Sequence, residues 1–503
     1  MLLNNSHSKY ETANTGHYLQ HFLEKNEKMV VIVLCMIALA RIFFFSAAFP
    51  FFNNVDEQYH FDAVVKHAHG YLPHKENDFF DLETTDFLVH NSSPEYFGGF
   101  SLASRLPDDP ADKGAWLIIK NREAFSPPVY YMMAGGWYKL GELIGFQGGY
   151  LLYWIRFMNI PVMFLLLCLA YYYCRYIEPP NFNLRIGVVV LLSFFPQDVF
   201  YSINSDVLSP LSFIGGLFVI TILFKENEHF WLYPLAGLAI ASTFLIKLSN
   251  IPALFVLSFM LLLLGKKYFS AHQVAKYAPR FLVMLAAAAI PIIVWGSLNY
   301  HNLGDLTGSS EKIKNLGWTA KSFGEMWDHP IFTPHGIIEF SSRLTESFWR
   351  GEFIWHGKKL ATETADAMYV VTTLIFIIAG LISIFSKNGS LSFNNKIFNY
   401  FHVLILLAYI SFLALLSMHY DFGKCFYPSN EYPYFTSGRL MLASLVSFLI
   451  IYVKGIEYLS AKVSKHIDPM VIIILVVFYS TYSEIMSVLA NGVFSSPYNF
   501  FHL

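Results

Sequence analysis

Long apolar stretches recur along the chain from residue 29 to residue 490, separated by short polar segments. Most are about 17 to 25 residues long, the length that an α-helix needs to cross the hydrocarbon core of a bilayer. They lack the alternation of polar and apolar positions that marks the strands of a membrane barrel. The pattern therefore predicts about eleven transmembrane helices. They are expected near 29–50, 150–174, 185–203, 206–224, 230–246, 250–265, 280–298, 368–386, 398–417, 438–455 and 469–490.

Composition agrees with this pattern. Hydrophobic residues make up 55% of the 503 residues and charged residues only 14%, which excludes a soluble globular protein. The segment 128–145 is moderately apolar but contains several glycines, a lysine and a glutamate, so it makes a poor lipid-facing span and is expected to be an interfacial helix. The first apolar run contains Arg41 and no small-residue cleavage pattern, which favours a retained signal anchor.

The distribution of lysine and arginine predicts the orientation. With a cytoplasmic N-terminus, the short cytoplasmic loops carry most of the cations, whereas the opposite short loops carry little more than Lys247 and Lys424. The cytoplasmic set comprises Arg175, Arg185, Lys225, Lys266, Lys267, Lys276, Arg280, Lys387, Lys396, Lys454, Lys462 and Lys465. This orientation places two large loops, about 51–149 and 299–367, and the C-terminus on the extracytoplasmic side. Both loops are expected to hold short amphipathic helices, and no internal repeat divides residues 1–503, so we expect a single domain.

Net charge and cysteine content narrow the possible partners. The formal net charge of -2 gives no reason to expect nucleic acid. Three of the four cysteines lie in apolar runs and Cys425 is alone in a polar loop, so neither a disulfide framework nor a metal site is predicted.

Two adjacent carboxylates, Asp56 and Glu57, follow the first span where it leaves the bilayer. A carboxylate at a partly dehydrated apolar surface can have a pKa raised toward neutrality, which suits it to accept a proton from an attacking hydroxyl. A solvated acidic helix end is the alternative interpretation. His60 lies four residues after Asp56, so the two can share a helical face and bind a metal, although a hydrogen-bonded or solvated histidine explains the same spacing.

These residues resemble the first-loop signature of the GT-C superfamily of polyprenyl-phosphate-sugar-dependent glycosyltransferases, and in particular the bacterial DUF2142 family. Further motifs follow in the same order: a Pro-Pro-aromatic segment at 126–131, Asn-Ser-Asp at 204–206, a Trp-rich segment at 347–355 and Gly-Arg at 438–439. Leu440 stands where the family pattern has a tyrosine, and no proline follows it. The resemblance implies an all-α transmembrane bundle of GT-C type.

Three further polar positions suit the recognition of a lipid phosphate. Lys247 and Arg439 lie at the outer ends of spans, where a cation is costly unless it faces an anion or a cavity, or reaches the headgroups. Asp206 lies in a turn between two spans, where Asn204 and Ser205 can also cap the next helix. Facing Asp56 across a cavity, Asp206 would orient sugar hydroxyls or the acceptor.

Trp349, Arg350 and Trp355 lie together in the second large loop. Indoles stack on sugar faces and an arginine between them can pair with phosphate, whereas membrane anchoring explains the tryptophans equally well. The nearby cluster of His419, Tyr420 and Asp421 is expected to be a loop.

The resemblance implies an inverting glycosyltransferase in the bacterial inner membrane. The expected donor is a polyprenyl-phosphate-linked sugar and the acceptor a glycan, a lipid or a protein at the extracytoplasmic face, with membrane lipids as the surroundings. Asp56 is the expected general base, with Glu57 as a second catalytic carboxylate. His60, Asp206, Lys247, Trp349, Arg350 and Arg439 are expected to bind substrate. No cofactor is required by this scheme, and the role of a divalent cation is left open.

Two other functions fit a polytopic membrane protein. A transporter or lipid-sugar flippase would have broken helices and charges near the bilayer midplane, whereas here most charges lie at span ends. A structural or assembly protein would use the first loop as a docking surface.

Overall fold

The computed structural model describes residues 25–54, 56–71, 79–91, 117–225, 229–268, 274–355, 358–386, 393–423, 425, 427–464, 467–496 and 499–502. Helices account for almost all of the regular structure in these ranges. Of the cations used to predict orientation, Lys387, Lys424 and Lys465 lie outside the described residues.

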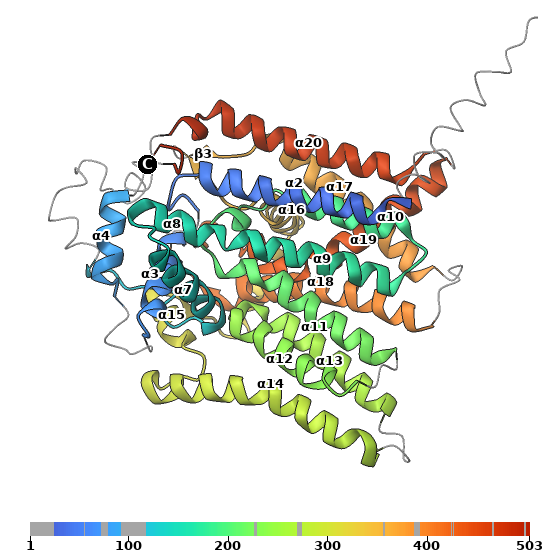
Figure 1. The fold of residues 1–503 in the computed structure, drawn as a ribbon, viewed down its shortest axis with the longest axis horizontal. Coiled ribbons are helices and arrows are strands. Elements are labelled where there is room, and N and C mark those ends of the chain that lie inside the picture. The colour runs from blue at the N-terminus through green and yellow to red at the C-terminus, as the bar shows by residue number, and fades with distance from the viewer. Residues whose placement is uncertain are drawn as a thin grey trace, which may run out of the picture.

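Twelve α-helices form the bundle, and most of them lie side by side along one direction (Figure 1). They are α2 (Glu27–Ala48), α8 (Gly148–Phe157), α9 (Asn159–Ile177), α10 (Phe182–Ser193), α11 (Ser209–Phe224), α12 (Leu232–Ile246), α13 (Ile251–Tyr268), α14 (Val274–Leu303), α17 (Glu363–Phe385), α18 (Phe393–His419), α19 (Leu445–Val463) and α20 (Pro469–Ala490). Nine segments of the described chain are long and apolar enough to cross a membrane, and α10 and α12 are shorter apolar helices. Each of these eleven segments lies at the position of a predicted span, and the all-α transmembrane bundle is confirmed.

The remaining helices lie at one end of the bundle or across it. They are α3 (Glu57–Ala68), α4 (Leu82–Asn91), α7 (Pro128–Leu143), α15 (Ser309–Leu316) and α16 (Pro334–Arg350). Figure 1 shows α3, α4, α7 and α15 gathered beside the C-terminus, and we call this the loop end of the bundle. Helix α16 is viewed nearly end-on in Figure 1, so it runs across the long helices. The described helices of the first large loop, α15 of the second and the C-terminal residues therefore lie at one end, which agrees with the orientation that the charge pattern predicts.

Short 3₁₀ helices and strands complete the described structure. The 3₁₀ helices are η2 (Asp198–Tyr201), η3 (Ser205–Leu208), η4 (Leu248–Asn250), η5 (Glu325–Asp328), η6 (Pro330–Phe332), η7 (Gly438–Ser444) and η8 (Val493–Ser495). Strand β1 (Thr319–Ala320) pairs antiparallel with β4 (Tyr420–Asp421), and β2 (Ile354–Trp355) pairs antiparallel with β3 (Lys358–Lys359). The expectation that 419–421 is only a loop was therefore wrong, because Tyr420 and Asp421 bind a strand of the second large loop.

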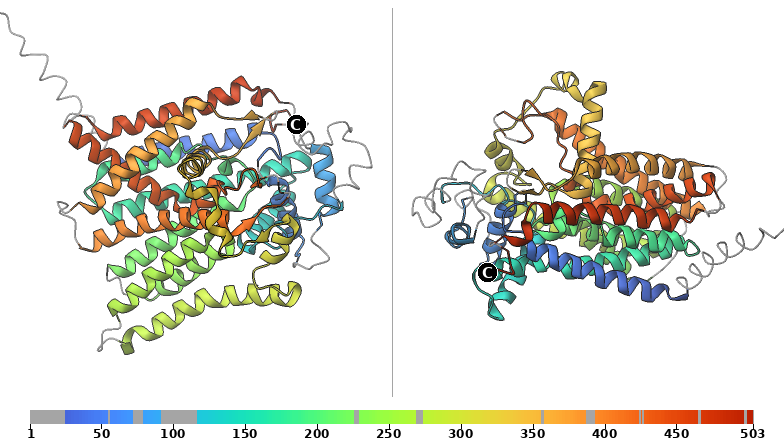
Figure 2. Two further views of the ribbon diagram at one scale, coloured as in Figure 1. Left: turned by 180° about the vertical axis from the view of Figure 1, so that it is seen from behind. Right: turned by 90° about the horizontal axis from the view of Figure 1, so that it is seen from above.

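The outer surface of the bundle is strongly apolar. Only 22% of the most apolar 18-residue window of α14, and the same share of that of α17, is buried inside the protein. Helix α14 exposes large aliphatic side chains such as Leu282, Ile290 and Ile293. Such a surface is suited to lipid, and Figure 1 and the view from behind in Figure 2 show α14 at the edge of the bundle.

Two predicted spans differ from the structure. The span expected at 185–203 ends as a helix at Ser193, because Pro196 follows and cannot donate the hydrogen bond of a continuing helix; the chain then turns into η2. The span expected at 150–174 is two helices joined at Met158. The 128–145 segment forms α7, which begins with Pro128 at its first position and is not among the helices able to span a bilayer.

Helices α17 and α19 approach closely through two glycines. A Cβ atom at Gly455 would overlap the carbonyl oxygen of Phe376, and one at Gly380 would overlap that of Ile451. Small residues allow this close backbone contact between membrane helices.

Replacing Gly455 with alanine is therefore expected to destabilise the bundle by about 1–3 kcal/mol, because the added methyl group forces the two backbones apart. Thermal unfolding in detergent, followed by tryptophan fluorescence, measures the effect. Gly136→Ala is the matched control, since a Cβ at that helical glycine meets nothing within 4 Å. Equal melting temperatures for both variants and the unmodified protein would contradict this packing.

A candidate active site at the loop end

The chain leaves α2 through a strained turn that presents Asp56. Phe52 has φ 60° and Asp56 has φ 66°, and these are the two non-glycine residues with positive φ in the described chain. Asp tolerates the left-handed region better than most residues, but a bulky side chain such as that of Phe52 does not. A pair of such conformations persists only where surrounding contacts hold it, and such strain is typical of functional sites.

Glu57 and Arg156 supply those contacts. Both side chains are fully buried, and they form a bidentate ion pair with two N–O distances of 2.7 Å. The Glu57 carboxylate also accepts the backbone N–H of Phe52 at 2.9 Å and that of Ile203 at 2.9 Å. Arg156 donates in turn to the carbonyl oxygens of the turn, including that of Pro50 at 2.9 Å. The hydrogen bonds of Glu57 and Arg156 therefore hold the strained turn against α8.

Arg439 is the centre of a second charged group. Its Nη2 atom donates to Asp56 Oδ2 at 2.6 Å, its Nη1 atom lies 3.7 Å from Asp206 Oδ2, and its Nε atom lies 3.4 Å from Glu352 Oε2. Lys247 also donates to Asp206 Oδ2, at 2.6 Å. We call these five residues the charge cluster. Four of them, Asp56, Asp206, Lys247 and Arg439, are the residues that sequence reasoning expected to meet.

Each member comes from a point where regular helix stops. Asp206 lies in η3, whose first residues are held by Asn204, because the Asn204 side chain accepts the N–H of Asp206 at 2.9 Å. Lys247 follows the last residue of α12, and Arg439 lies in η7, before α19 begins. Capping by Asn204, the ordinary interpretation of this turn, is thus confirmed, and the cap also aims Asp206 at the two cations.

The two carboxylates beside Arg439 have opposite pKa shifts. Burial is the largest single influence on the pKa of Asp56 and acts to raise it, but the charge and the hydrogen bond of Arg439, together with His60, leave the pKa below its ordinary value. For Glu352 burial prevails over the more distant guanidinium, and the pKa is raised. The expectation of a raised pKa for Asp56 was therefore wrong, because it took no account of a direct partner. Opposite shifts in neighbouring acids are a pattern of acid–base sites.

A hydrogen-bonded chain that begins at His60, beside the cluster, leads toward the second large loop. His60 Nδ1 lies 2.7 Å from the hydroxyl of Tyr131, which donates to Glu123 at 3.3 Å, and Glu123 pairs with Lys312 of α15. Burial lowers the pKa of His60 to about 3, so the imidazole is neutral. Burial acts to raise the pKa of Glu123, but Lys312, through its charge and its hydrogen bond, together with His60 and Lys247, holds that pKa well below its ordinary value. His60 is thus a neutral hydrogen-bonding group, at hydrogen-bonding distance from a single described side chain.

Several buried polar atoms in this region lack a hydrogen-bond partner in the described chain. Arg439 Nη1, His60 Nε2 and Asn204 Nδ2 are buried and have no hydrogen-bond partner among the described residues. Buried polar atoms in folded proteins are nearly always satisfied. Arg439 belongs to the charge cluster, Asn204 adjoins it in the chain and His60 adjoins it in space. A site built for a polar ligand would contain such unsatisfied atoms.

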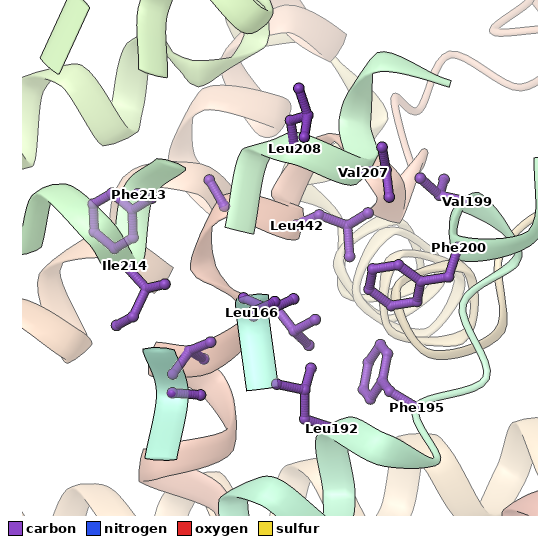
Figure 3. Close-up of a cluster of buried hydrophobic side chains, with 14 of the residues drawn as sticks. Leu166, Leu192, Phe195, Val199, Phe200, Val207, Leu208, Phe213, Ile214 and Leu442 are labelled. Carbon is purple, nitrogen blue, oxygen red and sulfur yellow. The ribbon is translucent and has the colours of Figure 1, made fainter. Parts of the chain in front are cut away.

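The cluster is surrounded by an apolar core. Figure 3 shows buried side chains from α9, α10, η2, η3, α11 and η7 packed together, among them Val207 and Leu208, which follow Asp206, and Leu442, which follows Arg439. Water is excluded from this side, which strengthens each interaction between charges. Asp56 is the more accessible acid, with 26% of its side chain exposed compared with 1% for Asp206.

Two expected substrate contacts lie away from the cluster. Trp349 is 1% exposed, stacks on Tyr369 at 5.0 Å between ring centroids, and donates to Thr373 at 2.9 Å. Arg350 forms a bidentate pair with Asp366. In this structure neither is available to a sugar or a phosphate, because each is already engaged in helix packing. The side chain of Trp355 lies outside the described residues.

Sequence reasoning missed Arg156, Glu123 and Glu352. Arg156 lies inside a predicted span, and an arginine there signals a buried partner. Glu352 lies within the Trp-rich segment, and its spacing in the sequence indicates no partner acid. Among the described residues, no group of three or more His, Cys, Asp and Glu side chains could hold a metal ion.

The fold and the cluster define a polytopic membrane protein with a buried charged site where its helices end. The chain belongs to the family described as "Predicted membrane protein (DUF2142)", which matches residues 38–424. No curated protein matches the chain. A solved structure, that of the Archaeoglobus fulgidus oligosaccharyltransferase in the apo form, is similar at 10% identity with a TM-score of 0.38. The similarity covers 92% of this chain and 56% of that one, so the chain spans little more than half the length of that protein.

Replacing Glu57 with glutamine is expected to destabilise the protein by about 3–5 kcal/mol, because Arg156 would remain buried without its anion. Thermal or denaturant unfolding in detergent measures this loss. Glu339→Gln is the control: Glu339 pairs with the partly exposed Arg343, and such a pair contributes about 0–1 kcal/mol. A Glu57→Gln variant as stable as the control would show that the strained turn does not depend on this pair.

Proposed function

We propose that the protein is an inverting membrane glycosyltransferase that transfers a sugar from a polyprenyl-phosphate donor to an acceptor. The observation that carries the proposal is the convergence of Asp56, Asp206, Lys247 and Arg439, from four separate parts of the chain, in one ion-pair cluster. In a purely structural cluster we would expect every charged atom to be hydrogen-bonded and shielded from solvent. This one includes a guanidinium nitrogen, Nη1 of Arg439, that makes no hydrogen bond to the described residues, and a partly exposed carboxylate.

The donor phosphate would bind between the two cations. Lys247 and Arg439 already share a single anionic oxygen, Asp206 Oδ2, at 2.6 and 3.7 Å. A phosphate oxygen placed beside Asp206 could accept from the free Nη1 of Arg439 and from the lysine ammonium. Arginine is suited to phosphate because its planar fork presents several donors at once.

Phosphate binding would also change Asp56. In the absence of substrate, Arg439 holds the Asp56 carboxylate at 2.6 Å and lowers its pKa. When the guanidinium turns toward the phosphate, Asp56 loses that stabilisation, and burial then raises its pKa. The carboxylate becomes a stronger base only when the donor is in place.

The chemical step is a single displacement. The acceptor hydroxyl oxygen attacks the anomeric carbon from the face opposite the phosphate, the new C–O bond forms, and the bond between that carbon and the phosphate oxygen breaks. The hydroxyl proton moves to Asp56, and the bonding electron pair leaves with the lipid phosphate. Lys247 and Arg439 stabilise the charge that develops on the leaving phosphate.

The other predicted residues take different roles in this scheme. Glu57 holds the turn that carries Asp56, and Trp349 and Arg350 belong to the packing of α16. His60 offers a neutral hydrogen bond to substrate through Nε2. Glu352, with its raised pKa, is the alternative base, since it also contacts Arg439.

The proposed setting is the bacterial inner membrane, with the N-terminus cytoplasmic and the loop end facing outward. The acceptor would be a glycan, a lipid or a protein that reaches this end. The unequal distribution of cations between the short loops supports the orientation. The lipid tail would lie against the apolar outer surface of the bundle.

Replacing Asp56 with asparagine is expected to lower sugar transfer by at least about 100-fold, because general-base catalysis contributes about 10²–10⁴-fold. Purified protein in nanodiscs, incubated with radiolabelled lipid-phosphate sugars and cell-envelope acceptors, provides the assay. Folding is checked by the melting temperature.

Glu339→Gln is the matched control, because it removes a carboxylate of α16 that pairs with a half-exposed arginine. Loss of transfer in Glu352→Gln but not in Asp56→Asn would move the base to Glu352. Donor movement across the bilayer without any transfer product would favour the flippase instead.

The pH dependence tests the exchange of partners at Arg439. Asp56 accepts a proton only while ionised, so activity is lost as pH falls through its pKa. The acid limb of kcat/KM reports the free protein and should lie below 3.8, the ordinary pKa of Asp, whereas the acid limb of kcat should lie at higher pH.

Arg439→Gln should move the acid limb of kcat/KM upward, since the charge that lowers the Asp56 pKa is removed. Arg343→Gln, a change at the surface of α16, should leave both limbs in place. Coincident limbs in the unmodified protein, with no shift in Arg439→Gln, would exclude the exchange.

A further inference from the structure

A groove of about 840 Å³ runs along the outside of the bundle between α9 and α11, away from the charge cluster. The two helices lie next to each other in Figure 1. Along most of its length the groove is lined by apolar side chains, including Leu165, Leu169, Leu211 and Phe218. Because both helices belong to membrane-spanning segments, the groove opens toward lipid.

The groove is long enough for a lipid chain. Along α11 its lining extends from Leu211, in the first turn, to Lys225, just past the last residue of the helix. Fourteen residues of α-helix rise about 21 Å, more than half of a hydrocarbon core of about 30 Å. An extended acyl chain of one leaflet therefore fits along it.

Two cations stand where the groove reaches the end of the bundle opposite the loops. Arg175, in the last turn of α9, is exposed and donates to the hydroxyl of Tyr171 at 3.3 Å. Lys225 donates to the carbonyl oxygen of Tyr176 at 2.7 Å and lies 4.4 Å from the centre of its ring. Neither forms an ion pair with a carboxylate of the described chain.

Lys225 does not simply extend its ammonium group into water. Its contacts with Tyr176 hold the ammonium group against the wall of the groove, beside Arg175. Both side chains keep donors beyond the bonds that they make, since an ammonium has three and a guanidinium five. An anion placed between them would be held by two positive charges, above an apolar slot.

We propose that this groove binds a membrane phospholipid with an anionic headgroup. Its phosphate would lie between Arg175 and Lys225, and one acyl chain would follow the apolar wall toward Leu211. This site is at the opposite end of the bundle from the charge cluster, so it does not depend on the proposed transferase activity. The bound lipid would fill the space between α9 and α11 and stabilise their packing.

Lipid binding to the full-length protein, purified in a neutral detergent, tests the proposal. Native mass spectrometry with dioleoyl phosphatidylglycerol and dioleoyl phosphatidylcholine, added separately, measures the affinity for each lipid. We expect tighter binding of phosphatidylglycerol, and a loss of about five-fold in that affinity for each of Arg175→Gln and Lys225→Gln. Phosphatidylcholine binding should be almost unchanged in both variants.

Lys462→Gln is the matched control, because Lys462 is an exposed cation in the last turn of α19, at the same end of the bundle. It should leave both affinities unchanged. Leu169→Trp, which fills the slot without altering charge, should weaken both lipids. Inorganic phosphate should not compete, since it cannot occupy the slot.

Three outcomes would overturn the proposal: equal affinity for the two lipids, an equal loss in Lys462→Gln, or unchanged binding in Leu169→Trp. Melting temperatures in detergent without added lipid show whether each variant folds. Arg175→Gln, Lys225→Gln and Leu169→Trp each test the proposal independently. If one variant misfolds, the lipid affinities of the other two still test it.

Discussion

Arg439 holds three carboxylates from three separate parts of the chain, and the arrangement of the loop end depends on it. Asp56 comes from the turn after α2, Asp206 from η3 and Glu352 from the segment after α16. Removing one partner from a buried charged group costs about 3–5 kcal/mol, so these segments are strongly constrained to meet. Lys247 adds a second positive charge beside Asp206, the most deeply buried of the three carboxylates.

The bundle makes room for this cluster by ending its helices early. Helix α10 stops at Ser193, and η2, η3, η4 and η7 replace regular helix around the charged side chains. Irregular backbone at membrane depth is tolerated where it is buried in protein or lines a polar cavity. The Glu57–Arg156 pair stabilises the irregular backbone of the turn after α2, because it hydrogen-bonds directly to peptide groups of Pro50 and Phe52. Because the surrounding side chains are packed and the peptide groups of the turn are hydrogen-bonded, the Asp56 carboxylate is the accessible group.

The helices were predictable from sequence because a run of apolar residues has one stable arrangement in lipid. The meeting of Asp56, Asp206, Lys247 and Arg439 was also predictable, since charged residues at span ends need partners. What the sequence did not reveal is which partner each acid takes. Adjacent residues Asp56 and Glu57 look equivalent in the sequence, yet one faces the cluster and the other is closed by Arg156. For Trp349 the sequence left sugar stacking and membrane anchoring equally open, because an indole that packs on Tyr369 has the same local sequence as one that meets a sugar.

The central claim is that a lipid phosphate replaces Asp56 as the partner of Arg439. Cryo-electron microscopy of the Asp56→Asn protein in nanodiscs, with a lipid-phosphate sugar bound, tests it most directly. The account predicts a phosphate within hydrogen-bonding distance of both Arg439 and Lys247, with the anomeric carbon near residue 56 and the lipid chain leaving toward the bilayer. Donor density at a different end of the bundle, with Arg439 still in contact with residue 56, Asp206 and Glu352, would contradict it.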